Sequence, residues 1–184
     1  MAIIVVGGSG KGVGKTALVC GLIAGLPECQ WTAVKITSHD YGKLEPVWEE
    51  TEAGQGTDTG RYLAAGAARA LLVTTRDGII PALKLKQAVA PGTGLILESS
   101  RILTHLEPEL CLGVLGPEGA GAEVKPSFQL FMRRADALVT LAASGSSIQP
   151  AGQAIPLFPL ARLELPSPEM LAWVRERLRP ASRS

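Results

Sequence analysis

The chain has 184 residues, with 18 Lys and Arg against 17 Asp and Glu, so that its formal net charge is only +1. This balance excludes a general electrostatic attraction to nucleic acid or to an anionic membrane, and we expect neither as a partner. The composition, 46% hydrophobic and 19% charged, is that of a globular protein and excludes general disorder. The three cysteines include no CxxC pair, which argues against a disulfide framework or structural zinc and predicts a reducing, cytoplasmic environment.

The first part of the chain alternates between expected strands and helices. The β-branched run at residues 2–6 predicts a strand that is buried on both faces of a parallel sheet. The apolar, proline-free stretch at residues 16–26 predicts a helix that ends at Pro27. Residues 31–36 are the second expected strand. A glycine-rich segment separates the first strand from the first helix.

Residues 37–56 are polar and acidic, and we expect them to form a long surface loop. A helix is expected next, at residues 57–67, with Thr57 or Asp58 as its N-cap. Further strands are expected at residues 70–74, 94–97, 110–115, 136–141 and 154–158, and further helices at residues 79–89, 126–134 and 169–178.

This alternation predicts an α/β domain that is doubly wound around a mostly parallel sheet, with helices on both faces. We expect a single P-loop nucleotide-binding domain with three layers over residues 1–180 and a frayed tail at 181–184.

The segment SGKGVGKT at residues 9–16 has the pattern of a phosphate-binding loop. Its glycines allow the backbone to approach an anion, and the N–H groups of the loop and of the helix N-terminus cradle phosphates. Lys15 is expected to reach the β- and γ-phosphates, and Thr16 to ligate Mg²⁺. The expected nucleotide contacts of this segment are Ser9, Gly10, Lys11, Gly12, Val13, Gly14, Lys15, Thr16 and Ala17.

The loop departs from the strict pattern GxxxxGK[ST] at Ser9, which stands where the first glycine would be. One large class of P-loop proteins, with GKGGVGKT, has a second lysine five residues before the main one. Here Lys11 precedes Lys15 by four residues. We expect Lys11 either to touch phosphate, including across a homodimer, or to be a solvated loop lysine.

A phosphate loop needs an acid that organises the metal ion. Glu98 ends the apolar run LIL and is expected to hold Mg²⁺ directly or through water, and to act in catalysis with Lys15. Ligands of open α/β sheets bind beyond the carboxyl ends of the strands, which is where Glu98 lies. Asp40 follows the second strand and is a further candidate for the same metal, whereas Asp136 precedes a strand and is expected to be structural.

The segments VKITSHDY, GTDTGRYLAAGA and ALLVTT resemble the molybdopterin-guanine dinucleotide biosynthesis protein B family, in which a strand with IKHxHHD precedes GKDSxRxxxAGA and another strand. On that pattern Lys35 matches the family lysine, and His39 and Asp40 match the end of HHD. Asp58 matches the acid of GKDS, and Arg61 matches the arginine. The resemblance places Lys35, His39 and Arg61 among the ligand-binding residues.

This chain departs from the family at Ile36, at Ser38 and at Ser99, where the family has histidines and a glycine. From the residues alone, His39 is expected to bind substrate, phosphate or metal, or to be solvated. Arg61 is expected to bind an anionic ligand or a neighbouring acid.

The resemblance implies a slow GTPase that is accessory to molybdenum-cofactor biosynthesis, with Mg²⁺ and with GTP or ATP. Its partners would be molybdopterin and a guanylyltransferase or molybdoenzyme. A small-molecule kinase or ligase on the same fold and a nucleotide-gated binding module remain as alternatives. The scarcity of His and Cys disfavours a nickel metallochaperone, and the guanine-selective motif [NT]KxD is absent.

Overall fold

The computed structural model describes residues 2–39, 42, 45–75, 79–89, 92–116, 126–142 and 155–178. Its strands are β1 (Ile3–Gly8), β2 (Thr32–Thr37), β3 (Val47–Glu50), β4 (Arg69–Thr74), β5 (Leu95–Glu98), β6 (Leu110–Val114), β7 (Ala137–Leu141) and β8 (Leu157–Leu160). Its helices are α1 (Lys15–Gly25), α2 (Asp58–Ala64), α3 (Ala82–Ala88), α4 (Pro126–Met132) and α5 (Pro168–Leu178), with short 3₁₀ turns η1 (Pro27–Cys29) and η2 (Ile102–Thr104).

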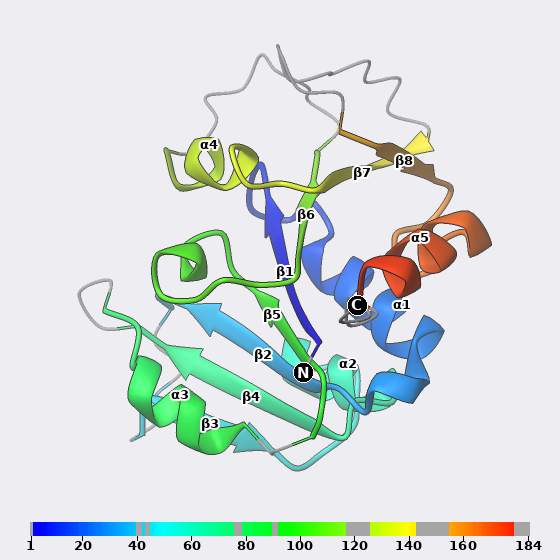
Figure 1. Cartoon of the computed structure of the whole chain (residues 1–184). Coiled ribbons are helices and arrows are strands. Elements are labelled where there is room, and N and C mark those ends of the chain that lie inside the picture. Colours follow the sequence, from blue (N-terminus) through cyan, green and yellow to red (C-terminus); the bar gives the residue numbers. More distant parts are fainter. Residues whose placement is uncertain are drawn as a thin grey trace, which may run out of the picture.

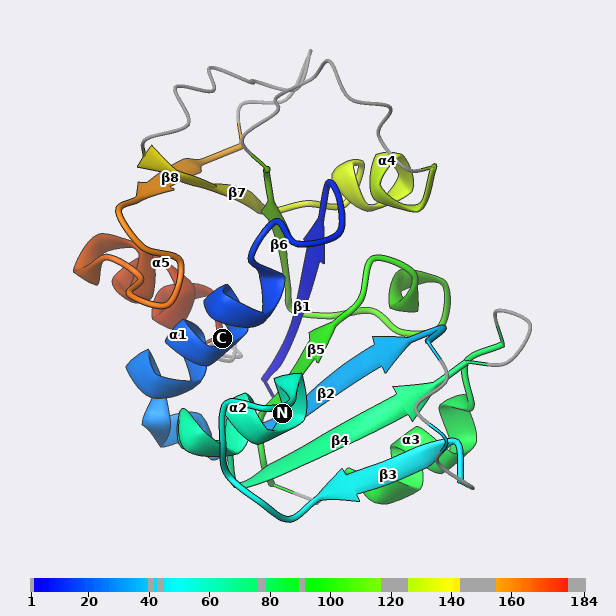
Figure 2. The ribbon, with the colours of Figure 1, turned by 180° about the vertical axis from the view of Figure 1, so that it is seen from behind.

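The strands form one eight-stranded sheet in the order β3-β4-β2-β5-β1-β6-β7-β8 (Figure 1). Neighbouring strands pair in parallel, except that β3 is antiparallel to β4. Figures 1 and 2 show α1, α2 and α5 over one face and α3 and α4 over the other. The predicted doubly wound α/β class with a mostly parallel sheet is therefore confirmed.

The first strand shows why both faces of the sheet are buried. Ile4 and Val6 pack in the layer that contains α1, α2 and α5. Val5, which lies between them, packs in the layer of α3 and α4. Because successive strand residues point to opposite faces, an unbroken β-branched run supplies both layers at once.

The register of the central strands brings their carboxyl ends together. Val6 of β1 lies opposite Glu98 of β5, so the loop that leaves β1 begins beside the acid that ends β5. On the other side of β5, Lys35 of β2 lies opposite the same Glu98. This edge of the sheet is where ligands of open α/β sheets bind.

The segment at residues 37–56 differs from the predicted loop. Val47–Glu50 forms β3, which pairs antiparallel with β4 at the edge of the sheet. The prediction of a long loop is therefore wrong over these four residues. Cross-strand pairing decides the conformation of a short edge strand more than its composition does.

Most other elements lie within a few residues of their predicted positions. Thr57 is confirmed as the N-cap of α2, because its hydroxyl accepts a hydrogen bond from the N–H of Gly60 at 2.9 Å. The helix expected at residues 79–89 begins only at Ala82, and the strand expected at residues 154–158 is displaced to Leu157–Leu160. The tail at 181–184 lies outside the described residues.

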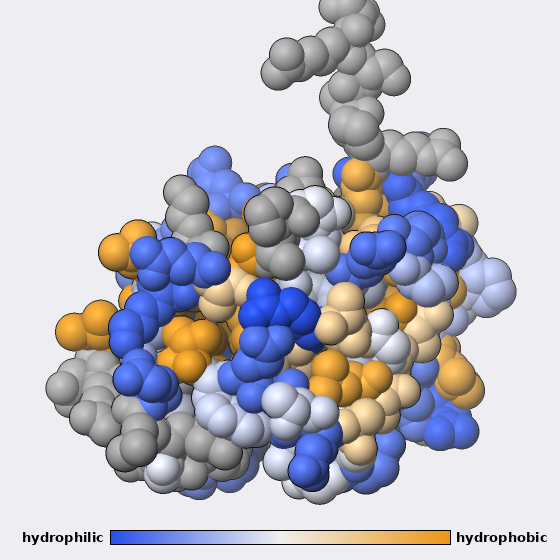
Figure 3. Space-filling model, turned by 90° about the horizontal axis from the view of Figure 1, so that it is seen from below, coloured by the Kyte–Doolittle hydropathy of each residue, from blue (hydrophilic) through white to orange (hydrophobic). Residues whose placement is uncertain are grey.

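Figure 3 shows the face that lies below in Figure 1, where hydrophilic residues separate the apolar ones into small groups. The large apolar side chains that are exposed in the described residues are Ile79, Leu83, Leu130 and Leu165. Across the described part of the chain, no helix has the length and apolar character needed to cross a membrane.

Candidate functional site

The loop between β1 and α1 owes its shape to two glycines. The φ angle is +76° at Gly12 and +95° at Gly14, a region that residues with a side chain rarely adopt. A Cβ atom on Gly14 would also lie 2.1 Å from Cδ1 of Leu163, in the segment after β8. Any larger residue at Gly14 would therefore displace the Leu163 side chain or the loop, and it would also have to adopt the positive φ angle.

Ser9 explains how the loop tolerates its departure from the strict motif. Its N–H donates to the carbonyl of Val114 at 3.0 Å, and its hydroxyl accepts from the N–H of Gly116 at 2.9 Å. Among the described non-glycine residues only Gln30 has a positive φ, so Ser9 needs no glycine conformation. The serine ties the start of the loop to the end of β6.

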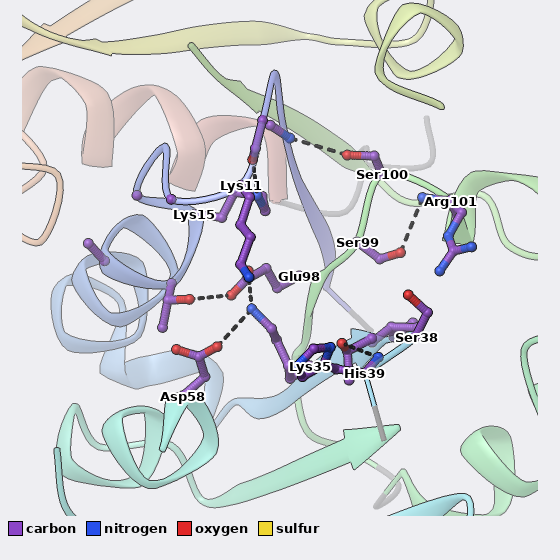
Figure 4. A pocket seen from close by; sticks show the side chains of 18 of the residues that line it. Lys11, Lys15, Lys35, Ser38, His39, Asp58, Glu98, Ser99, Ser100 and Arg101 are labelled. Atoms are coloured by element: carbon purple, nitrogen blue, oxygen red, sulfur yellow. Dashed lines mark hydrogen bonds and ion pairs between the residues drawn. The ribbon is translucent and has the colours of Figure 1, made fainter. Parts of the chain in front are cut away.

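A cavity of about 620 Å³ opens at the carboxyl ends of the strands (Figure 4). The predicted site residues that line it are Gly10, Lys11, Gly12, Gly14, Lys15, Thr16, Ala17, Lys35, His39, Arg61 and Glu98. Ser9 and Val13 are not among its lining residues, and Val13 packs against the hydrophobic core. Asp40 lies outside the described residues.

Glu98 lies at the centre of this site and is nearly completely buried, with 3% of its surface exposed. Its Oε2 accepts hydrogen bonds from the hydroxyl of Thr16 at 2.7 Å and from the hydroxyl of Tyr62 at 2.5 Å. Its Oε1 accepts from the ammonium of Lys35. Both carboxylate oxygens are thus held, which fixes the side chain and satisfies a buried charge.

Lys35 joins two carboxylates rather than projecting freely into the cavity. Its Nζ lies 2.8 Å from Oδ2 of Asp58 and also contacts Glu98 (Figure 4). Burial alone would lower the pKa of Lys35, but the charges of Glu98 and Asp58 outweigh burial and raise it. The sequence predicts Lys35 as a ligand contact, and the structure places its charged ammonium between two acids at the cavity wall.

One turn of α2 contributes three polar groups to the site. Asp58 pairs with Lys35, and Arg61 approaches Asp58 at 3.9 Å. Burial raises the pKa of Asp58, but its bonds to Lys35 outweigh this effect and lower the pKa overall. Tyr62 is completely buried, and burial together with the charge of Glu98 raises the pKa of its phenol well above the usual value. Tyr62 is therefore a protonated hydrogen-bond donor to Glu98.

Tyr62 and the segment after β5 are the parts of the site that sequence reasoning missed. The signal for Tyr62 is its spacing, one helical turn after Asp58 on a helix that packs against the sheet. Ser100 accepts from the N–H of Gly8 at 3.2 Å, and Arg101 also lines the cavity. No motif marks these residues.

Lys15 and Thr16 have the positions that their motif predicts. Nζ of Lys15 donates to the carbonyl of Gly10 at 2.8 Å, so that the lysine lies across the loop. Thr16 at the start of α1 reaches Glu98. The hydroxyl and carboxylate oxygens offered here are the ligands that Mg²⁺ prefers, so the residues present fit this metal.

The described residues contain no group of three or more His, Cys, Asp or Glu that would hold a metal ion. Mg²⁺ at phosphate sites is usually held by one or two protein groups together with the substrate's phosphates.

No family model matches the chain, and no curated protein matches it in sequence. Among the solved structures that are similar in fold are the following two. The "apo" form of LpxK from Aquifex aeolicus in complex with ATP has a TM-score of 0.54 and 20% identity, covering 85% of this chain and 53% of LpxK. The MobB protein homolog from Bacillus stearothermophilus has a TM-score of 0.51 and 16% identity, covering 97% of this chain and 99% of that one.

Both similar proteins are P-loop NTPases. This chain has the same fold. The mostly parallel sheet, the loop between β1 and α1 and the two likenesses agree on a P-loop NTPase architecture. At these identities the likeness shows the fold alone, and the chain spans about half the length of LpxK.

Proposed function

We propose that this protein binds GTP or ATP with Mg²⁺ on the loop at residues 9–16 and hydrolyses the γ-phosphate slowly. The observation that carries this proposal is the hydrogen bond of 2.7 Å between Thr16 and Glu98. This bond joins the hydroxyl of Thr16, the proposed Mg²⁺ ligand of the loop, to Glu98 at the end of β5. Lys15 is the residue next to Thr16. This combination of groups is what phosphoryl transfer on this fold requires.

In this mechanism water attacks the γ-phosphorus in line with the β–γ bridging oxygen, and the bond between that oxygen and the γ-phosphorus breaks. The products are the nucleoside diphosphate and inorganic phosphate, and the proton that the water loses passes to a phosphate oxygen or to solvent. Mg²⁺, when bound, supplies positive charge to the triphosphate. Lys15 stabilises the negative charge that develops on the phosphate oxygens, and Glu98 orients Thr16. The cavity has two carboxylates among the described residues, Glu98 and Asp58, and both are paired with Lys35. Neither is a free base for the attacking water, which supports slow turnover.

We propose further that the hydrolysis serves molybdenum-cofactor biosynthesis. The support is the resemblance of residues 34–75 to the family named above and the likeness to the MobB homolog over nearly the whole of both chains. The partners proposed on this basis are molybdopterin and a guanylyltransferase or molybdoenzyme.

A small-molecule kinase is the second candidate, and one observation favours it. The cavity continues beyond the phosphate loop to Ser38, Arg101 and Ser127, where an acceptor molecule has space. Product analysis separates the two candidates. Phosphate released to water supports the hydrolase, whereas a phosphorylated small molecule supports the kinase.

The central experiment is the Lys15→Ala substitution. Removing the ammonium should abolish triphosphate binding in the presence of Mg²⁺ and leave the fold intact, because the Lys15 side chain lines the cavity and is not part of the hydrophobic core. Calorimetric titration with GTP and with ATP measures the binding, and circular dichroism checks the fold. Lys84→Ala is the matched control, since Lys84 is 55% exposed on α3 and pairs with Glu45 at the surface. Unchanged affinity in a folded Lys15→Ala protein would contradict the proposed function.

A further inference from the structure

The charges around the cavity are unequal. Among the described residues, five cationic side chains line it, namely Lys11, Lys15, Lys35, Arg61 and Arg101, against the two carboxylates Asp58 and Glu98. Lys35 pairs with both carboxylates, and Arg61 approaches one of them. The excess of positive charge in a concave site favours anionic ligands.

Arg101 lies outside the phosphate loop and takes no part in the ion pairs around Glu98 and Asp58. Its guanidinium makes no hydrogen bond or ion pair with any residue that the structure describes, and the residue is exposed. Arginine presents a planar fork of donors that matches carboxylate and phosphate oxygens. An arginine of this kind on a cavity wall is suited to an anionic ligand.

The backbone around Arg101 is anchored although its side chain is exposed. Its N–H donates to the hydroxyl of Ser99 at 3.1 Å, and its carbonyl accepts from the hydroxyl of Thr104 at 3.1 Å. Ile102 and Leu103, which follow directly, are buried with 1% and 7% of their surfaces exposed. The guanidinium is therefore carried by a fixed segment, which reduces the entropy lost when a ligand binds.

Arg101 lies apart from Lys11 and Lys15 of the phosphate loop (Figure 4). In the same view Arg101 and Asp58 lie on opposite sides of Glu98. Ser38 and His39, which follow β2, are on the same side of the picture as Arg101 and line the same cavity. A ligand held by Arg101 would face the triphosphate across the carboxyl end of β5.

We propose that this end of the cavity binds a second, small anionic ligand, a phosphate monoester or a carboxylate, at the same time as the nucleotide, and that Arg101 is its charge partner. The inference rests on the proposed nucleotide site and adds a substrate or effector class to it. If the protein is a hydrolase, the anion would be an effector that is bound during hydrolysis. If it is a kinase, the anion would be the acceptor of the phosphoryl group.

The test begins with the phosphate loop already filled. Protein saturated with Mg²⁺ and a nonhydrolysable triphosphate is titrated with inorganic phosphate and, separately, with acetate, and binding is measured by calorimetry and by the NMR signal of the Arg101 side chain. Because the γ-phosphate position is occupied, saturable binding reports a second site. We expect such binding for at least one probe.

Arg101→Gln should weaken this binding by about tenfold or more, since it removes a charge-assisted pair, and should reduce the triphosphate affinity much less. Arg101→Lys retains the charge without the fork and should be intermediate. Arg133→Gln is the matched control, because Arg133 is an exposed arginine that does not line the cavity, and it should bind the probes as the unchanged protein does.

Three results would overturn the inference. They are no saturable binding of either probe, equal binding by the Arg101→Gln protein, and a tenfold loss of triphosphate affinity in that variant, which would assign Arg101 to the nucleotide. A different result, failure of the unchanged protein to bind any triphosphate, would overturn the proposed function and the second site with it. The calorimetric step with triphosphate alone distinguishes these cases.

Discussion

Lys35 contacts both carboxylates that the structure describes in this site. Its ammonium lies between Glu98 and Asp58, and a metal ion bound through Glu98 would bring further positive charge to the same acids. Lys35 thus balances the two carboxylates when no cation is bound. We therefore expect the stability of the protein without Lys35 to depend on Mg²⁺.

Lys35→Met should destabilise the protein and make its stability depend on Mg²⁺. Removing one partner of a fully buried ion pair costs about 3–5 kcal/mol, and the loss should be smaller here because the Lys35 side chain is 17% exposed. Added Mg²⁺ should raise the melting temperature of the variant more than that of the unchanged protein, since it supplies the missing charge. Thermal melting with and without Mg²⁺ measures both effects.

Lys35→Arg is the control for this substitution, because it retains the charge. It should melt close to the unchanged protein and show no greater response to Mg²⁺. A Lys35→Met protein that melts normally and ignores Mg²⁺ would show that the two acids do not need the lysine.

Sequence reasoning found some residues of the site and missed others for a physical reason. Lys15 and Thr16 follow from a local motif, and Glu98 follows from its place after an apolar run. The contact between Lys35 and Glu98 joins residues 63 positions apart and depends on which strands are neighbours. Tyr62 likewise reaches Glu98 only because α2 packs over β2 and β4. Local patterns do not contain this information.

At the scale of elements, β3 shows how acidic residues can be used inside a sheet. Glu49 accepts two hydrogen bonds from the guanidinium of Arg69 on β4, at 2.7 and 2.6 Å. The acidity that predicted a loop therefore supplies a cross-strand ion pair. Because the partner strand lies about 20 residues away, the segment alone does not reveal the pairing.

Glu50 connects β3 to the start of α2. Its carboxylate is buried and accepts from the N–H groups of Thr51 and Glu52 and from the hydroxyls of Thr57 and Thr59. This cluster holds the turn that caps α2, and α2 carries Asp58 into the site. Burial raises the pKa of Glu50, but the donated hydrogen bonds outweigh burial and lower it.

Glu50→Gln should destabilise the protein at neutral pH by about 1–3 kcal/mol, the cost of leaving buried hydrogen-bonding groups unsatisfied. The effect should depend on pH. Since the pKa of Glu50 is lower in the folded state than its ordinary value of 4.5, the charge stabilises the fold above that value, and this contribution is lost as the pH falls through the folded pKa. Urea unfolding at pH 7 and near pH 4 measures the difference, which should shrink at the lower pH.

The neighbouring Glu52 provides the comparison, because its side chain is exposed. Glu52→Gln should change stability little at either pH. If Glu50→Gln has no larger effect than Glu52→Gln, the cluster does not hold the turn.

At the scale of the whole molecule, nucleotide binding should stabilise the fold by mass action. A ligand at a concentration of 100 Kd adds about 2.7 kcal/mol. For a chain of this length, each kcal/mol raises the melting temperature by roughly 2–4 °C. Triphosphate with Mg²⁺ should therefore raise it by about 5–10 °C. Thermal scans at several ligand concentrations measure the shift.

The Lys15→Ala protein should show no such shift at the same concentrations. Equal shifts in both proteins would mean that the ligand binds elsewhere. This comparison needs no turnover, so it tests binding separately from hydrolysis.

The position of β1 also governs the order in which the molecule can be completed during synthesis. β1 lies between β5 and β6, so a strand made early has neither neighbour until residues 95–114 have been translated. At about 5–20 residues per second, the apolar run Ile3–Gly8 waits on the order of 5–20 s for its partners. Gly14 waits longer still, because its packing partner is Leu163. On the ribosome, the phosphate loop is therefore encoded early but assembled late, and its strand must be shielded from aggregation in the interval.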